Sequence, residues 1–141
     1  MTPAEIDLVQ ASFRRLLPVA HRVGTLFFAK LLELDPELRA ALDGDRVTRD
    51  RRLVQWVALA VNGLSHPTTL APVVRRAGRR SAGLFTGPGR FDAIGTALIW
   101  ALEEAANEPF ADETRNAWAR AYWYLANLLR AGVREAEATA A

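Results

Sequence analysis

Apolar residues recur at helical spacing along most of the chain. Ile6, Val9, Phe13 and Leu17 stand three or four positions apart, as residues on one helix face do. No stretch alternates with a period of two, and no Asn-Gly hairpin signal occurs. The pattern therefore predicts an all-α fold. The predicted helices cover residues 3–17, 19–34, 35–42, 48–64, 69–84, 90–106 and 112–134.

Capping residues mark several of these boundaries. Thr2, Pro3 and Glu5 form a capping box with proline at the first helical position. Asp35 followed by Pro36 repeats the same order of cap and proline. The run Asp43-Gly44-Asp45 predicts a turn, and the small, charged tail over residues 135–141 is expected to fray.

The predicted helix over 69–84 carries an apolar stripe with one hydroxyl in it. The stripe comprises Leu70, Val73, Val74, Ala77 and Leu84, and Ser81 falls on the same face. Four arginines occupy the other side of this helix: Arg75, Arg76, Arg79 and Arg80. The helix is therefore expected to lay an apolar face, with Ser81 in it, against the rest of the protein.

Composition narrows the chemistry that the chain can support. Its 141 residues suit one domain over 1–141, and half of them are apolar. The absence of cysteine excludes disulfides, thiolate catalysis and zinc sites held by sulfur, and it is compatible with a cytoplasmic location. A net charge of +2 argues against a nucleic-acid partner, and no apolar run is long enough to span a membrane.

The order of several short motifs resembles the bacterial single-domain globins, the type also found as the haem domain of flavohaemoglobins. The motifs are Thr2-Pro3 with Ile6, Val9 and Phe13, then Leu26-Phe27-Phe28, Asp35-Pro36-Glu37-Leu38, Leu70-Ala71-Pro72-Val73, Gly78-Arg79-Arg80, Gly95-Thr96-Ala97-Leu98 and Ala117-Trp118-Ala119-Arg120-Ala121-Tyr122. The resemblance runs from about residue 2 to 134. It implies a globin-like fold of seven to eight helices.

The residues that hold haem in that family are replaced here. The family's proximal histidine corresponds to Ser81, and its haem-wedging phenylalanine corresponds to Leu42. The distal polar position corresponds to Arg49, where these globins often carry glutamine. A neutral hydroxyl is a poor iron ligand compared with imidazole. The resemblance therefore implies a globin fold without conventional haem ligation, so no cofactor is expected, with haem as the alternative.

Ser81 has two interpretations. Its hydroxyl could contact a ligand in the former haem space, or it could be buried and bonded to a carbonyl one turn back. We favour the second interpretation, because helical serines often bond in this way. His21 and His66 do not form a metal pair, and Tyr122 is expected to pack with Trp118 rather than ligate iron. No metal site is predicted.

The space occupied by haem in globins is expected to be lined or filled by side chains. The predicted ligand-pocket residues are Phe27, Phe28, Leu42, Arg49, Leu53, Trp56, Val57, Ser81, Leu84, Phe91 and Leu98. Filling by Trp56 and the phenylalanines is the favoured outcome, because an empty cavity is destabilising.

The arginines allow two interpretations as well. An anion-binding rim would comprise Arg49, Arg52, Arg79 and Arg80, and Arg90 belongs to the same clusters along the chain. Alternatively, these side chains form a solvated face, which is the more common role of charge runs.

No catalytic motif occurs, so the chain is not expected to be an enzyme. GxSxG, HExxH and a phosphate-binding loop are all absent. The leading hypothesis is a haem-free globin-fold module that senses or binds an apolar or anionic small molecule, or that binds another protein. The alternative is a haem protein with atypical ligation that binds oxygen or another diatomic gas. A homodimer through Trp100, Trp123 and Tyr124 is left open.

Overall fold

The computed structural model describes residues 1–42 and 44–140, and all regular structure in these residues is helical. The elements are α1 (Pro3–Leu16), η1 (Leu17–Val19), α2 (Ala20–Leu34), η2 (Pro36–Arg39), α3 (Arg46–Gly63), α4 (Pro67–Arg80), α5 (Ala82–Phe85), α6 (Arg90–Ala106) and α7 (Asp112–Ala140). The predicted all-α, globin-like fold is confirmed. No helix in the described residues is long and apolar enough to cross a membrane.

The first helix begins as the sequence predicts. The Thr2 hydroxyl accepts the Glu5 N–H at 3.1 Å, and the Glu5 carboxylate accepts the Thr2 N–H at 2.8 Å. Pro18 then limits the next turn to the 3-10 helix η1, because proline cannot donate a helical hydrogen bond. Asn107 ends α6 with a left-handed backbone, φ 59°.

Several predicted boundaries differ from the structure. The short helix predicted over 35–42 is only the 3-10 helix η2, Pro36–Arg39. Helix α3 starts at Arg46 rather than Thr48, because the Asp45 side chain caps it by accepting the Thr48 N–H. The predicted helix over 69–84 begins earlier and is interrupted at Ser81. The tail predicted to fray continues α7 to Ala140 instead, in a segment rich in strong helix formers. Asp43 of the predicted turn and Ala141 of the tail lie outside the described residues.

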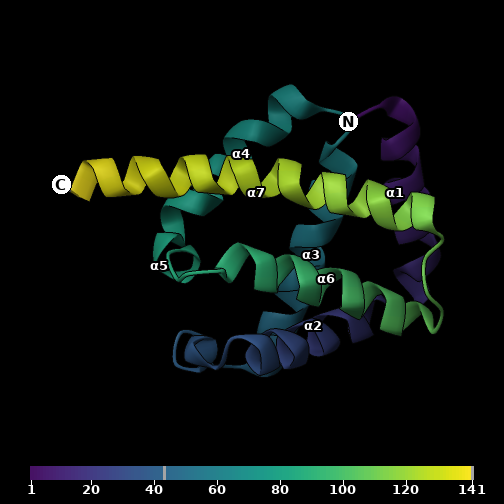
Figure 1. Ribbon diagram of the computed structural model, residues 1–141, viewed down its shortest axis with the longest axis horizontal. Coiled ribbons are helices and arrows are strands. Elements are labelled where there is room, and N and C mark those ends of the chain that lie inside the picture. The colour runs from purple at the N-terminus through teal and green to yellow at the C-terminus, as the bar shows by residue number, and fades with distance from the viewer. Residues whose placement is uncertain (43, 141) are drawn as a thin grey trace.

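The long helix α7 organises the molecule and packs across both α4 and α1 (Figure 1). Helix α2 packs against α6 and α3. A buried hydrogen bond of 2.8 Å from Trp118 Nε1 to Ser12 Oγ joins α7 to α1. The main core includes Val9, Phe27, Val74 and Leu102.

Two glycines bring α4 and α7 into close contact. A Cβ atom added at Gly78 would lie 2.2 Å from the Leu129 carbonyl oxygen, and one at Gly132 would lie 2.0 Å from that of Arg75. Such distances are far below van der Waals contact, so only glycine fits at these positions. This crossing fixes which face of α4 is turned toward α7 and which face remains open.

Candidate functional site

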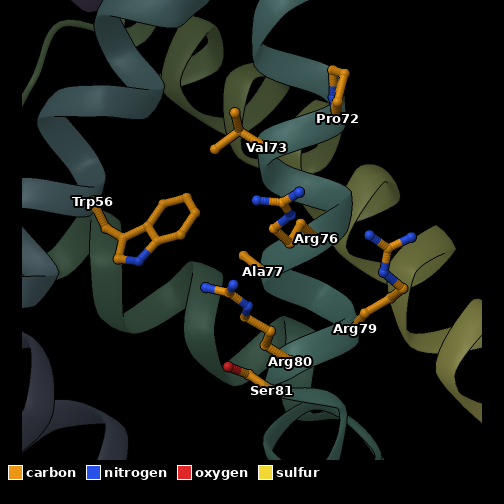
Figure 2. Close-up of a pocket in the computed structure, with 8 residues that line it drawn as sticks. All are labelled: Trp56, Pro72, Val73, Arg76, Ala77, Arg79, Arg80 and Ser81. Carbon is orange, nitrogen blue, oxygen red and sulfur yellow. The ribbon is translucent and has the colours of Figure 1, made fainter.

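A groove of about 570 Å³ lies between α3 and α4 (Figure 2). Only Trp56 comes from α3; the rest of the lining belongs to α4 and the residue that ends it. The lining residues are Trp56, Pro72, Val73, Arg76, Ala77, Arg79, Arg80 and Ser81.

The apolar residues of α4 are divided between two faces. Leu70, Val74 and Gly78 are buried, and Gly78 meets α7 directly. Val73, Ala77 and Ser81 follow at intervals of four, so they form a neighbouring row, and this row lines the groove. Val73 is consequently 41% exposed. The sequence predicted one inward stripe, but the structure divides these residues between a face buried against the protein and a face that lines the groove.

Ser81 ends α4 and does not sit within it. Its backbone has φ −112° and ψ 25°, and its N–H donates to the Ala77 carbonyl at 3.0 Å. The side chain is half-buried, and its hydroxyl has no hydrogen-bond partner within residues 1–42 and 44–140. The favoured interpretation, a buried hydroxyl bonded one turn back, is therefore wrong. The hydroxyl faces the lower end of the groove (Figure 2).

Arg76 and Arg80 extend into the groove, one helical turn apart. Figure 2 shows both guanidinium groups on the side of α4 that faces Trp56. Arg79 points away, and its Nη1 lies 2.7 Å from a Glu135 carboxylate oxygen on α7. In the part of the chain that the structure describes, neither Arg76 nor Arg80 has an acidic partner within 4.0 Å.

The predicted anion rim is assembled only in part. Arg79 and Arg80 line the groove, whereas Arg49 and Arg52 do not. The Arg49 guanidinium lies 4.1 Å from the Phe28 ring centroid, and its Nη1 donates to the Leu42 carbonyl at 3.0 Å. These contacts hold Arg49 beside the crossing of α2 and α3.

Arg90 is also not part of a rim, because its side chain is only 9% exposed. Its Nε donates to the Asp35 carboxylate at 2.7 Å, and its Nη1 donates to the Leu84 carbonyl at 3.2 Å. Asp35 therefore makes no side-chain cap for η2, contrary to the capping role predicted for it. The buried ion pair joins the start of α6 to the end of α2.

Most of the predicted pocket residues belong to the core. Phe27, Phe28, Val57 and Phe91 are buried, and four leucines pack against them from partly buried positions. Those leucines are Leu42, Leu53, Leu84 and Leu98. Trp56 and Ser81 alone among the predicted pocket residues line the groove, together with Arg79 and Arg80 of the predicted rim. Trp56 is 41% exposed, so it does not fill the space as expected.

The groove offers none of the usual iron ligands. Its lining contains no imidazole, thiolate, thioether or phenol. His66 is the N-cap of α4 and lies at the opposite end of that helix from Ser81, a separation of about 22 Å at the helical rise per residue. His21 is exposed. No group of three or more His, Cys, Asp or Glu that could hold a metal occurs among the described residues.

Tyr122 is committed to a structural hydrogen bond. Its hydroxyl donates to the buried Phe91 carbonyl, between α7 and α6. Burial raises the pKa of this phenol well above its ordinary value of 10.0, although the charge of Arg130 acts in the opposite direction. Among the described residues, the Tyr122 ring makes its aromatic contact with Trp123 and not with Trp118, the partner predicted for it. The residues present therefore do not fit axial ligation of a haem iron.

Comparison of the sequence with known proteins gives relatives of the globin type. No family model matches the chain. The chain is 24% identical, over 92% of its length, to the flavohemoprotein of Xylella fastidiosa. It is 28% identical over its whole length to that of Bordetella parapertussis and 24% identical to that of Rhizobium meliloti. These relatives support a globin-type domain. The chain spans about a third of their length, 33% and 36% in the first two cases.

Proposed function

We propose that this chain is a globin-fold binding module whose groove between α3 and α4 takes a small molecule without ligating an iron atom through the protein. One observation carries the proposal: Ser81, at the end of α4, lies in a groove lined by arginines and a tryptophan. The resemblance to globins implies that Ser81 stands where that family has its proximal histidine. A neutral hydroxyl binds haem iron poorly. Arg76 and Arg80 suit an anionic ligand instead.

The proposal is for binding and not for catalysis. The groove lining contains no carboxylate or imidazole that could act as a general base, and its one hydroxyl has no base beside it. The proposed location is the cytoplasm, since a chain without cysteine suits a reducing compartment.

A second candidate is a haem protein with atypical ligation that binds oxygen or another diatomic gas. Two observations favour it: its similar relatives are flavohemoproteins, and the groove volume of about 570 Å³ lies within the range of cofactor sites. Haem would then be held by the arginines and Trp56 without a strong axial ligand from the protein.

Introducing a proximal ligand separates the two candidates. Hemin is added to the wild-type protein and to the Ser81→His variant, and the absorption spectra are compared. We expect a sharp Soret band of a histidine-ligated haem in Ser81→His only, with an affinity at least about tenfold higher than that of the wild type.

A Ser81→Ala variant is the matched control, because it changes the same position without supplying a ligand. Its spectrum should equal that of the wild type. A sharp, stoichiometric Soret band in the wild-type protein would contradict the proposal and would support the atypical haem protein instead.

A further inference from the structure

We infer that the groove binds a planar aromatic anion, with the ring against the Trp56 indole and the acidic group held by Arg76 and Arg80. This inference rests on the proposed function, since it requires the groove to be a small-molecule site. It adds a ligand class: a flat, unsaturated ring system carrying a carboxylate or a comparable anionic group. Two independent observations, one for each half of the ligand, carry it.

The first observation is an apolar surface left in solvent. Trp56 and Val73 are both 41% exposed, and they face the same groove from opposite helices. A tryptophan side chain can bury roughly 150–250 Å², so its exposure forgoes considerable stabilisation. Figure 2 shows the Trp56 indole reaching from α3 toward Ala77 of α4. A flat ring inserted between them would cover both surfaces, and aromatic rings stack favourably on indole.

The second observation is an uncompensated pair of positive charges. Arg76 and Arg80 stand at positions i and i+4 of α4, where like charges repel. No acidic side chain among the described residues pairs with either one, whereas Arg79 between them pairs with Glu135. A carboxylate held by both guanidinium groups would remove the repulsion and make charge-assisted hydrogen bonds. Among the described residues, Arg79 therefore has a carboxylate partner, whereas Arg76 and Arg80, which face the groove, have none.

The size of the groove suits a small molecule. Its volume of about 570 Å³ lies within the range of small-molecule sites. Ala77 and Ser81 are small and lie in the row facing Trp56, so the side chains opposite the indole take up little of the groove. The Ser81 hydroxyl, which has no hydrogen-bond partner among the described residues, can donate one further hydrogen bond to the anionic group.

Three matched probes test the planar ring and the anionic group of the ligand separately. Isothermal titration calorimetry of the wild-type protein with 2-naphthoate should give binding in one-to-one ratio. The same ring without charge, 2-naphthalenemethanol, should bind at least about tenfold more weakly, since it loses the charge-assisted bonds. Decahydro-2-naphthoate keeps the charge but not the planar ring, and it should also bind at least about fivefold more weakly.

Variants locate the binding site. Arg76→Gln and Arg80→Gln should each weaken 2-naphthoate at least about fivefold, whereas Arg75→Gln should leave it unchanged. Arg75 is exposed on the same helix but does not line the groove. Arg75→Gln therefore removes one positive charge from α4 without changing the proposed site. Trp56→Leu should weaken 2-naphthoate while leaving decahydro-2-naphthoate unchanged. Thermal melts check that each variant is folded.

Several results would overturn the inference. One is equal binding of the three probes. Another is loss of binding in Arg75→Gln to the same extent as in Arg80→Gln. A third is saturable binding of an acidic peptide, but not of 2-naphthoate, at Arg76 and Arg80. These outcomes leave the hemin spectra of the wild type and Ser81→His unaffected, so failure of the ligand class is distinguishable from failure of the proposed function.

Discussion

At the residue scale, the buried ion pair of Arg90 and Asp35 is expected to stabilise the fold most clearly among the side-chain contacts outside the groove. The two side chains are 9% and 14% exposed, and their closest N–O distance is 2.7 Å. Removing Asp35 would leave the Arg90 charge buried with only the exposed Glu37 carboxylate near it, at 3.8 Å. Asp35→Ala should therefore lower the free energy of unfolding by about 3 kcal/mol.

Glu37→Gln provides the matched control for this prediction. Glu37 also faces Arg90, at 3.8 Å, but its side chain is 84% exposed, so its removal should change stability by less than about 0.5 kcal/mol. Urea denaturation of both variants measures the difference. Equal losses in the two variants would show that burial does not govern this ion pair.

The phenol of Tyr122 gives a second prediction, in which pH supplies the test. Tyr122→Phe removes the hydrogen bond to the Phe91 carbonyl and should destabilise the protein by about 1 kcal/mol at pH 7. Burial raises the pKa of this phenol in the folded protein above its ordinary value of 10.0. The unfolded chain therefore loses this proton first as the pH rises.

The stability that Tyr122 contributes is consequently complete below pH 10 and declines above it. The difference in unfolding free energy between the wild type and Tyr122→Phe should shrink as the pH is raised from 9 to about 11. Urea denaturation at each pH measures it. A constant difference across this range would contradict the raised pKa.

At the element scale, the crossing of α4 and α7 determines where the groove lies. In Gly132→Ala the added Cβ would stand 2.0 Å from the Arg75 carbonyl oxygen and 2.9 Å from the Arg79 nitrogen. The helices must separate to relieve this overlap, so we expect a destabilisation of about 3 kcal/mol, at the upper end for overpacking. Binding of 2-naphthoate should weaken too, because α4 carries most of the groove.

Gly83→Ala is the control, because a Cβ there would meet no atom within 4 Å. Its stability should stay within about 0.5 kcal/mol of the wild type. Thermal unfolding followed by circular dichroism compares the two variants. A Gly132→Ala protein as stable as Gly83→Ala would show that the helices are not held in close contact.

Also at this scale, the helices were predictable from the sequence and the faces of α4 were not. The capping box at Thr2 and the stop at Asn107 are local signals, and the structure contains both. The periodicity of α4 shows which residues are apolar but not which of them meet another helix. That division depends on Gly78 and Gly132, whose effect comes from a partner about fifty residues away in the sequence.

At the scale of the whole molecule, some residues of the candidate site could be predicted from the sequence and others could not. Ser81, Trp56, Arg79 and Arg80 line one groove, and their assignment to a ligand site stays a prediction. Arg49 was assigned to the same site, but its contacts with Phe28 and Leu42 come from tertiary packing that periodicity does not encode. Arg76 lines the groove but was not included in the predicted anion rim. Its i, i+4 spacing from Arg80 was the sequence signal that places both side chains on one helix face.

At this scale we propose that a globin-like fold binds its ligand in the groove between α3 and α4 without iron ligation by the protein. The most direct test of this proposal compares the affinity of the wild-type protein for hemin with its affinity for iron-free protoporphyrin, measured by fluorescence quenching and absorption. Without a protein ligand the iron adds nothing, so we predict dissociation constants within about twofold of each other. Hemin binding at least about tenfold tighter than the iron-free porphyrin, with a sharp Soret band, would contradict the account.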